Sequence, residues 1–432
     1  MEERRSIGVA VLGCGIVGSG ALRVLHANAD QIAARVGIPV EVVGVGEPNL
    51  AKAEGVPVPV ERFTADSHAL VVRQDVDIVV EVIGGIEPAR SLILEAMAAG
   101  KHVVTANKEL LATRGPELFE AANRFGVDLY FEAAVGGGIP LIHPLRESLA
   151  GDRVTKVMGI VNGTTNYILT RMSESGCSFG EALAEAQSLG YAERDPSADI
   201  EGFDAAAKCA ILATIAFDTS VVAGDVYREG ITNITSQDIS FAASLGYAVK
   251  LLAIAEEQDG EVAVRVHPAM IPKSHPLAGV RDAFNAVFVE GEAVGQLMFY
   301  GRGAGGSPTG AAIAGDIVDI SRNLVAGGRG PGMPCVGSPK RVRPMDDTLA
   351  QYYILLDVAD RPGVLATVAG VFGDNEVSIR SVWQEGTGEA AQLVLITHRA
   401  RERDLQATLQ GLERQPTVSR IASVMRVEGS EG

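Results

Sequence analysis

Residues 7–18, IGVAVLGCGIVG, decide the fold of this chain of 432 residues. A β-branched run leads into a G-x-G-x-x-G motif at Gly13, Gly15 and Gly18, and residues 19–37 continue with helical spacing. In the order strand, turn, helix, these glycines permit the turn, let the backbone approach a pyrophosphate, and let helix pack on strand. A purely structural turn is the alternative, but the position directly after an apolar strand favours dinucleotide binding.

The second predicted strand, residues 40–46, ends at Glu47, which lies 29 residues after Gly18. This spacing exceeds the roughly 20 residues that usually precede the ribose-binding acid, so we expect a long first helix. A carboxylate here can hold the ribose hydroxyls of NAD, and Lys52 is the nearest cation for the 2′-phosphate of NADP. A solvated loop glutamate is an equal alternative, so the choice between NAD and NADP stays open.

Residues 76–85 and 100–108 each read as a strand that ends in a turn, and a helix is predicted between them at 88–99. Strands that alternate with helices indicate parallel βαβ units. The turns then lie at the carboxyl ends of the strands, where open α/β sheets bind ligands. Lys108 at such a turn is a candidate for contact with the substrate or the nicotinamide ribose; a surface lysine at a helix start is the alternative.

The densest group of ionisable residues is the segment 190–208, GYAERDPSADIEGFDAAAK, which combines five carboxylates with Lys208. The Ala-rich run at 203–217 predicts a helix that is buried on most faces. Asp204 and Lys208 are four residues apart and therefore share one helical face. A buried lysine is costly unless a carboxylate receives it. A structural ion pair would explain these two residues alone, but the density of carboxylates favours a polar substrate pocket.

Three consecutive glycines, residues 136–138, follow a predicted strand near 127–131. A tight loop of this kind exposes backbone carbonyl groups that can hold a monovalent cation or cradle a ligand. Taken by themselves, these residues favour a flexible crossover between two domains.

The pattern changes at residue 154, where residues 154–172 read as strand, turn and helix. Further helices are expected after residue 208, followed by strands near 262–272 and 286–290. Residues 295–324 then predict a strand, a glycine turn and a helix that returns to the first domain.

The segment 326–348 is rich in Gly and Pro and has no periodicity, which is typical of a linker. Residues 349–432 follow the pattern βαββαβ, a small domain of about 80 residues. We therefore predict an α/β chain with a Rossmann-type domain at 1–140, completed by a helix at about 308–325. An α+β catalytic and dimerisation domain at 141–307 precedes the linker.

The composition restricts the class of partner. A net charge of −17 argues against nucleic acid and anionic membrane surfaces. No run is long and apolar enough to span a membrane, and residues 1–6 lead into a strand rather than a signal-peptide cleavage site. The four cysteines are far apart and form neither a disulfide framework nor a zinc motif. We expect a protein of the reducing cytoplasm.

Six stretches together resemble a known family and an appended module. They are GCGIVG (13–18), HVVTANKELLA (102–112), FEAAVGGGIPLI (131–142), VNGTTNYIL (161–169), GYAERDPSADIEGFDAAAK (190–208) and DVADRPGVLATVAGVF (357–372). The first five resemble homoserine dehydrogenases over residues 7–324, and the last resembles an ACT module. The resemblance implies reversible reduction of L-aspartate 4-semialdehyde to L-homoserine with NADP or NAD, in the biosynthesis of threonine, methionine and isoleucine.

The resemblance also implies roles for individual residues. Lys208 is the proton donor to the carbonyl oxygen, and Lys108 assists near the reacting carbon. The amino-acid end of the substrate is bound by Glu193, Asp199 and Asp204. The cofactor is contacted by Gly13, Gly15, Ile16, Val17, Gly18, Glu47, Thr105, Lys108, Gly190 and Gly303. The backbone of four residues matches the family's sodium or potassium site, which replaces the crossover interpretation of that loop: Glu132, Val135, Gly137 and Ile139.

Many relatives carry an arginine for the 2′-phosphate after the second strand, where this chain has GEPN at residues 46–49. The ACT resemblance implies feedback control, with threonine as the expected effector. The candidate effector residues are Asp360, Gly363, Val364, Leu365 and Asn375. A homodimer or homotetramer fits the family.

Two competing functions can be compared with this interpretation. An aspartate semialdehyde dehydrogenase requires a nucleophilic cysteine, and neither Cys14 in the glycine turn nor Cys209 in a helix has a base beside it in the sequence. A nucleotide- and amino-acid-sensing regulator without turnover would need no buried cation opposite carboxylates. Lys208 therefore favours an enzyme.

Overall fold

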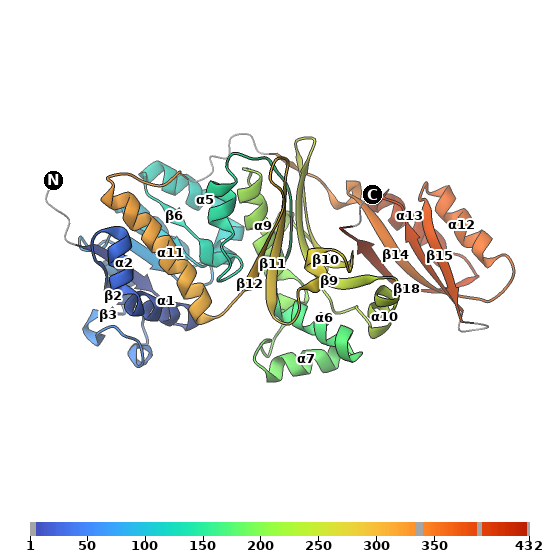
Figure 1. Cartoon of the computed structure of the whole chain (residues 1–432), viewed down its shortest axis with the longest axis horizontal. Helices are drawn as coiled ribbons and strands as arrows, with labels where there is room; N and C mark the ends of the chain where they lie inside the picture. Colours follow the sequence, from blue (N-terminus) through green and yellow to red (C-terminus); the bar gives the residue numbers. More distant parts are fainter. Residues whose placement is uncertain (1–5, 333–339, 387–390, 430–432) are drawn as a thin grey trace.

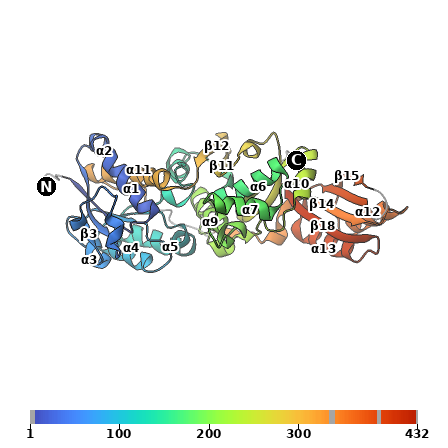
Figure 2. The ribbon, with the colours of Figure 1, turned by 90° about the horizontal axis from the view of Figure 1, so that it is seen from below.

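The computed structural model describes residues 6–332, 340–386 and 391–429. The molecule is elongated and has three parts in a row (Figures 1 and 2). A domain built on a parallel sheet lies at one end, a middle part contains a mixed sheet, and a smaller αβ unit lies at the other end. Within the described ranges, no helix is long and apolar enough to cross a membrane.

The first domain has a six-stranded parallel sheet with the order β3-β2-β1-β4-β5-β6, and this confirms the predicted Rossmann-type fold. Its strands are β1 (Ile7–Leu12), β2 (Val40–Gly46), β3 (Phe63–Thr64), β4 (Ile78–Glu81), β5 (His102–Thr105) and β6 (Leu129–Tyr130). Its helices are α1 (Ile16–Ala27), α2 (Ala29–Val36), α3 (Ser67–Val71), α4 (Ala89–Ala98) and α5 (Lys108–Phe125). β1 and β4 are buried along their whole length, as expected for strands covered on both faces.

The predicted long first helix is wrong, because it is broken into α1 and α2 at Asn28. The side-chain amide of Asn28 donates to the carbonyl of Val24 at 2.9 Å. Asparagine competes in this way with the helical backbone, so it favours helix ends over helix interiors. The helical spacing of residues 19–37 does not reveal the break, since both pieces bury apolar residues.

The middle part combines a mixed sheet with helices. Its strands are β7 (Val154–Ile160), β8 (Tyr227–Arg228), β9 (Tyr247–Gln258), β10 (Glu261–Pro272), β11 (Phe284–Gly291) and β12 (Gly295–Arg302), and its helices are α6 (Gly163–Ser175), α7 (Phe179–Ser188), α8 (Ser197–Ile200), α9 (Phe203–Ala216) and α10 (Ser236–Ser244). Strand β9 lies where only helices were expected, so this prediction is wrong. It is a long strand paired antiparallel with β10 from Tyr247 to Gln258. Its apolar run is continuous, and such a run does not distinguish a buried strand from a buried helix.

Helix α11 (Gly306–Val325) returns from the middle part to the first domain and packs against α1, as Figure 1 shows. The contact is very close. A Cβ atom on Gly20 would lie 2.1 Å from the carbonyl oxygen of Gly306, and one on Gly310 would lie 2.7 Å from the amide nitrogen of Ala21. Glycine is therefore required at both positions, and the two helices join the first domain rigidly to the strand that precedes α11.

The last unit has the predicted βαββαβ order. It contains β14 (Leu349–Val358), α12 (Val364–Asp374), β15 (Ile379–Glu385), β16 (Ala391–Thr397), β17 (Ala400–Arg401), α13 (Glu402–Glu413) and β18 (Val418–Val427). β18 pairs in parallel with β10 of the middle part, where Ala269 lies opposite Arg426 and Met270 opposite Val427. The two sheets are therefore continuous, in the order β12-β11-β7-β9-β10-β18-β14-β16-β15. The sequence did not predict this continuity.

Part of the predicted linker is attached to the middle part. Residues 333–339 of the linker lie outside the described ranges. Just beyond them, β13 (Arg341–Val342) pairs with β10, and the ammonium of Lys340 donates to Phe217 O and Glu257 Oε2, both at 2.7 Å.

Candidate functional site

The glycine turn after β1 fits a dinucleotide. Gly13 adopts φ 99°, and a Cβ on Gly18 would lie 2.1 Å from the carbonyl oxygen of Gly13. A Cβ on Gly15 would meet nothing within 4 Å, so Gly15 faces open space. Helix α1 begins at Ile16, which is 77% exposed, and no side chain caps its first turn. Its uncapped N–H groups provide the donors that a pyrophosphate needs.

Glu47 lines a hollow beside this turn, together with Lys52. It is buried rather than solvated, and its carboxylate accepts from Cys14 N at 2.9 Å, Asn49 N at 3.1 Å and Lys52 Nζ at 3.1 Å. Burial opposes ionisation, but these donors hold the pKa of Glu47 below its ordinary value. The hollow therefore contains an ionised carboxylate at the end of β2.

A second cleft, of about 650 Å³, opens between the start of α5 and the middle part. The structure brings six of the predicted site residues into its wall: Lys108, Gly190, Asp199, Asp204, Lys208 and Gly303. The remaining wall includes Asn162, Gly163, Thr164, Tyr191, residues 282–285 and residues 302–305.

Asp204 binds both predicted catalytic lysines. Its Oδ1 lies 2.9 Å from Lys108 Nζ, and its Oδ2 lies 2.7 Å from Lys208 Nζ. Lys208 also donates to the carbonyl oxygen of Val161 at 2.7 Å. The side chains of Asp204 and Lys208 are almost fully buried, whereas that of Lys108 is 43% exposed. Two ammonium groups therefore share one carboxylate at the cleft.

The electrostatics of this group follow from its burial and its charges. Burial opposes ionisation of Asp204, but Lys208 and Lys108 overcome this effect and hold the pKa of the carboxyl well below its usual range. Burial likewise opposes the charge on Lys108, but Asp204, with Asp199 behind it, raises the pKa of Lys108 above its ordinary value. Asp204 is therefore ionised and Lys108 is protonated at neutral pH.

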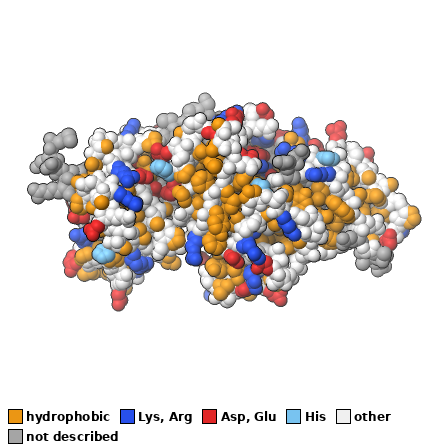
Figure 3. Space-filling view, viewed as in Figure 1, with side chains coloured by type: hydrophobic (Ala, Val, Ile, Leu, Met, Phe, Trp, Pro, Cys, Tyr) orange, Lys and Arg blue, Asp and Glu red, His pale blue; other side chains and the backbone are white. Residues whose placement is uncertain are grey.

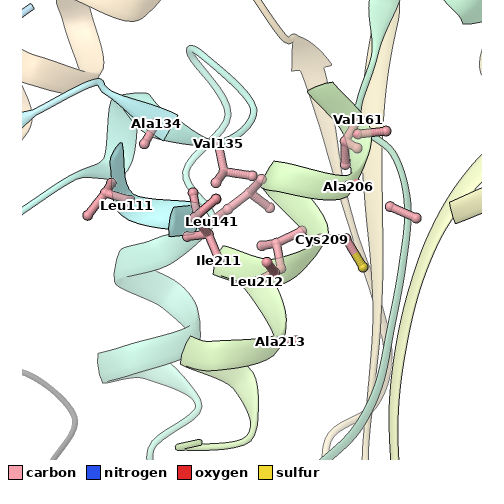
Figure 4. Packing of buried hydrophobic residues seen from close by; sticks show 14 of the residues in the cluster. Leu111, Ala134, Val135, Leu141, Val161, Ala206, Cys209, Ile211, Leu212 and Ala213 are labelled. Carbon is pink, nitrogen blue, oxygen red and sulfur yellow. The ribbon is translucent and has the colours of Figure 1, made fainter. Parts of the chain in front are cut away.

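Helix α9 positions Lys208 because the rest of its surface is apolar. Figure 4 shows Ile211 of this helix beside Leu141, with Val135 of the same loop (residues 132–141) nearby, and all three belong to one buried apolar cluster. An Ala-rich helix leaves room for close packing on all sides, so α9 is held by most of its circumference. The ends of the Asp204 and Lys208 side chains then reach the cleft, next to Val161 O.

Asn162, which the sequence analysis did not select as a site residue, joins this group. Its side-chain amide donates to Asp199 Oδ1 at 2.6 Å and to Asp204 Oδ2 at 2.9 Å, while its own oxygen accepts from Thr165 N and caps α6. An asparagine before a helical run is a recognisable cap signal. That signal predicts the cap, but not the two carboxylates beyond it.

Several predicted residues lie outside the cleft. Glu193 is exposed on the neighbouring loop and does not contribute to the cleft wall. Thr105 is fully buried, and its hydroxyl donates to Glu81 Oε2 at 2.6 Å. Val17 is partly buried in the core behind the glycine turn.

The candidate effector residues separate into two groups. Asp360, Gly363, Val364 and Leu365 lie at or just before the start of α12, and Val364 is buried. Asn375 follows the last residue of this helix of 11 residues, at a distance of about 16 Å along the axis. A single chain therefore does not bring Asn375 together with the other four.

The loop at residues 132–139 has carbonyl groups that suit a monovalent cation. The carbonyl oxygens of Val135, Gly137 and Ile139 accept none of the backbone hydrogen bonds found among the described residues. The carboxylate of Glu132 is occupied, since it accepts from the amides of Leu141, Ile142 and His143. The loop itself thus has free carbonyl acceptors next to a buried negative charge.

Asp316 of α11 adds a second carboxyl group to this region and accepts from Glu132 N at 3.0 Å. Burial, with the charge of Glu132, raises the pKa of Asp316 well above its ordinary value. A cation bound to the nearby carbonyl groups would reduce this repulsion, so the residues present fit such an ion. No cluster of three or more Asp, Glu, His or Cys side chains suitable for a metal occurs within the described ranges.

Cys14 and Cys209, the two cysteines considered as nucleophiles, do not support nucleophilic catalysis. Cys209 lies beside Lys208 in the chain, but it is fully buried, and burial raises the pKa of its thiol to about 12. Burial also raises the pKa of Cys14, and the negative charge of Glu47 adds to this effect. A thiol that stays protonated is a poor nucleophile, which argues against an aspartate semialdehyde dehydrogenase.

Together, a dinucleotide cradle and a cleft with carboxylate-bound lysines define a nicotinamide-dependent oxidoreductase with an appended regulatory-type domain. Residues 13–132 match the NAD-binding domain of homoserine dehydrogenase, residues 140–318 match the homoserine dehydrogenase domain and residues 352–416 match the ACT domain.

The chain is 51% identical to the homoserine dehydrogenase of Mycobacterium tuberculosis, covering 99% of both chains. It superposes on the crystal structure of a homoserine dehydrogenase from Thiobacillus denitrificans with a TM-score of 0.93, at 42% identity and 98% coverage of both chains. A hyperthermophilic archaeal homoserine dehydrogenase in complex with NADPH gives a TM-score of 0.61 at 26% identity, covering 73% of this chain and 97% of the other. The chain belongs to the homoserine dehydrogenase family.

Proposed function

We propose that this chain catalyses the reversible reduction of L-aspartate 4-semialdehyde to L-homoserine, with NADPH or NADH as the reductant, as a step toward threonine, methionine and isoleucine. The observation that carries the proposal is the bridge from Asp204 to Lys108 and Lys208 in a cleft that adjoins the dinucleotide turn. The test is oxidation of homoserine by the full-length protein, followed by the absorbance of the reduced nicotinamide. Absence of turnover with both cofactors would contradict it.

Lys208 supplies the proton for the reaction. When bound, the nicotinamide donates a hydride to the carbonyl carbon, and negative charge develops on the carbonyl oxygen. An ammonium group near this oxygen stabilises the charge and then transfers its proton. Lys208 is held for this task by Val161 O and Asp204, which leaves its third N–H for the substrate. Lys108, more exposed, adds positive charge near the reacting carbon.

The carboxylates of the cleft bind the ammonium group of the substrate. Asp204 already accepts from Lys108, Lys208 and Asn162, so it contributes mainly by orienting the lysines. Asp199 is half-buried in the wall and Glu193 is exposed on the same segment, and we assign the ammonium contact mainly to these two. Asp199→Asn should raise the KM for homoserine more than the KM for the cofactor. An equal change in both would contradict this assignment.

Glu47 governs the choice between NAD and NADP. Its ionised carboxylate repels a 2′-phosphate, whereas Lys52, 45% exposed and 3.1 Å away, attracts one. Glu47→Ala should therefore raise the ratio of kcat/KM for NADP to that for NAD relative to the unmodified chain. Lys52→Ala should lower this ratio, and an unchanged ratio in both variants would contradict the role of this hollow.

A sodium or potassium ion is the proposed ligand of the carbonyl groups of Glu132, Val135, Gly137 and Ile139. The free carbonyl groups and the two buried carboxyl groups beside them support it. Such an ion would hold the loop that packs on the cofactor wall, since a Cβ on Gly137 would lie 2.5 Å from Gly303 O. Replacing both ions by tetramethylammonium should lower the melting temperature, and no change would contradict the site.

The ACT domain is proposed to bind threonine and to reduce activity, because its sheet continues through β18 into β10, against which α9 packs. Truncation would strip β18 from β10, so the test is made in the full chain. Asp360→Ala should weaken inhibition by threonine without changing activity in its absence. Identical threonine titrations for both proteins, or no inhibition of either, would contradict the proposed control.

An oligomer is proposed to form through the exposed face of the sheet. Figure 3 shows apolar side chains gathered over β11 and β12, and the exposed apolar residues of this region include Val294, Met298 and Tyr300. A contiguous exposed apolar surface of this kind marks an interaction site. Tyr300→Asp should lower the mass of the particle measured by light scattering if a homodimer or homotetramer forms there.

We further propose the bounds of the three functional domains. The cofactor domain comprises residues 1–140 together with 308–325, the catalytic domain residues 141–307, and the regulatory domain residues 349–432. The sheet topology and the return of α11 support this division.

The described cysteines Cys14, Cys177 and Cys209 are unpaired, which supports a reducing, cytoplasmic location. Cell fractionation tests the location.

A further inference from the structure

Asn285, at the start of β11, lines the cleft but has no role in the reaction as described above. Its side chain is 2% exposed, and its Oδ1 atom has no hydrogen-bond partner among the described residues. Buried amides nearly always have their hydrogen bonds satisfied, since an unmatched acceptor loses its interaction with water and gains nothing in return. A group of this kind in the wall of a cleft indicates that a ligand supplies the missing partner.

The amide of Asn285 lies directly against Gly303. A Cβ atom on Gly303 would be 2.0 Å from Asn285 Nδ2 and 2.7 Å from Oδ1, so any larger residue there would displace the amide. The terminal torsion of asparagine is soft, and a half turn exchanges the oxygen and the nitrogen. Asn285 can therefore present a donor and an acceptor at the part of the wall formed by Gly303.

The wall around Gly303 is the side of the cleft nearest to the dinucleotide turn. Residues 303–305 lead into α11, and a Cβ on Gly306 would lie 2.9 Å from the carbonyl oxygen of Ile16 at the start of α1. The lining of the same cleft also contains Asp204 and its two lysines. The nicotinamide end of a dinucleotide that starts at the α1 turn would thus pass along residues 303–305 before it reaches the lysines.

The backbone that leads into Asn285 is held by other side chains. The amide nitrogen of Asn166 donates to Asp282 O at 2.9 Å and to Phe284 O at 3.2 Å. Lys250 donates to Asn166 Oδ1 at 3.0 Å and to Val280 O. The position of Asn285 therefore does not depend on hydrogen bonds from its own amide, and this amide is available for recognition.

We propose that the side-chain amide of Asn285 pairs with the carboxamide of the nicotinamide ring and positions the ring for hydride transfer. Two primary amides are complementary, because each has one acceptor and N–H donors. A neutral partner also suits a ring whose charge changes during the reaction. The inference rests on the dinucleotide binding of the proposed function and adds the residue that recognises its reactive end.

The test measures binding, not turnover, in the full-length protein by isothermal titration calorimetry. The probes are the preferred reduced dinucleotide, its 3-acetylpyridine analogue, which has a methyl ketone in place of the carboxamide, and the corresponding ADP-ribose, which lacks the ring. Asn285→Ala should lower the affinity for the dinucleotide about tenfold. The affinity of the variant for ADP-ribose should stay within about twofold of that of the unmodified chain. Its loss of affinity for the analogue, which has no N–H donor, should be clearly smaller than its loss of affinity for the dinucleotide.

Asn166→Ala serves as the control for an effect through the backbone. It removes the support of the 282–284 segment but retains the side chain of Asn285, so any loss of affinity should be the same for the dinucleotide and its analogue. Equal losses of all three ligands in Asn285→Ala, or no loss of any, would overturn the proposal. Asn285→Ser fills more of the space, and the same pattern is expected from it should the alanine variant fail to fold. Failure of the unmodified chain to bind any probe would instead overturn the proposed function.

Discussion

Two buried groups of charges in this molecule differ in how their charges are matched. In the cleft, two lysines share the single carboxylate of Asp204. At the junction of β10 with the ACT domain, two arginines face four carboxylates. Arg265 pairs with Glu256 at 2.7 Å and Glu428 at 2.8 Å, and Arg426 pairs with Glu229 and Glu402, both at 2.9 Å.

The difference separates a reactive site from a structural one. Burial opposes the charge of Arg265 and Arg426, but their carboxylate partners raise the pKa of both guanidinium groups above the ordinary value. An arginine engages carboxylates with a planar fork and cannot give up its proton, so this junction is electrostatically closed. In the cleft, two ammonium groups share the one carboxylate that binds both, and Lys108 is partly exposed, so N–H donors remain for a developing alkoxide. We infer that burial and pairing alone do not mark a catalytic site; ammonium groups whose N–H donors face a cleft do.

The largest effect is expected from Lys208→Met. Removing the proton donor should lower kcat/KM for homoserine by about 10²–10⁴-fold, since this is the usual contribution of a general acid. Affinity for the dinucleotide should stay within about twofold, because the fold of the α1 turn does not depend on Lys208. Steady-state kinetics and calorimetry measure the two quantities. A kcat/KM that changes less than about tenfold would show that Lys208 is only a structural partner of Asp204.

Arg426→Met should mainly affect stability. Both carboxylate oxygens of Glu402 accept from Arg426, so the substitution leaves Glu402 buried without a cation. Removing one partner of a buried ion pair lowers the free energy of unfolding by about 3–5 kcal/mol. Urea unfolding of the full chain measures the loss, with Lys108→Met as the matched control in the cleft. If the control loses as much stability as Arg426→Met, the distinction between the two groups is wrong.

Lys250 offers a third arrangement, a buried lysine that meets carbonyl oxygens rather than a carboxylate. Burial lowers its pKa to about 8, below the value of about 10.4 expected in the unfolded chain. Between these values the unfolded chain binds more protons, so stability should rise with pH from about 8 to 10. Relative to Lys250→Met, the unmodified chain should gain up to about 3 kcal/mol over this range, measured by urea unfolding. A constant difference would contradict the lowered pKa.

The smallest effect is expected from an exposed pair. Arg420 donates twice to Asp357 Oδ2, at 2.8 and 3.0 Å, but its side chain is 68% exposed. Water screens such a pair, so Arg420→Ala should change the free energy of unfolding by less than about 1 kcal/mol. The same urea experiment applies, with added salt reducing the difference further. A loss of stability as large as that of Arg426→Met would mean that burial does not determine how much each ion pair stabilises the fold.

The sequence was most informative where one residue type is required by the local backbone. Gly13 and Gly18 predicted the turn, because the positive φ of Gly13 and the close contact between them exclude larger residues, and the motif with Gly15 indicated a dinucleotide. Asp204 and Lys208 could be placed on one face from their spacing alone. The resemblance of residues 190–208 to one family then gave the reaction, and the comparisons bear out the family.

Local patterns failed where a neighbour distant in sequence decides the outcome. The break at Asn28 and the strand β9 were missed, since an apolar run packs equally well in either conformation until its partner is known. Asn162 and Asn285 were not selected, because single asparagines are common and their role depends on what faces them. Glu193 remains exposed, although the same segment contributes Asp199 to the cleft.

By itself, the sequence determined the βαβ order of the first domain, the βαββαβ order of the last and the charges available to the site. Only the tertiary structure decided that Lys108, 96 positions before Asp204, meets the same carboxylate as Lys208, and that β18 continues the sheet of the middle part. The physical reason is the separation along the chain of the residues that interact. Turns, caps and helical faces depend on residues a few positions apart, whereas the matching of buried charges and the joining of sheets depend on contacts that exist only once the chain has folded.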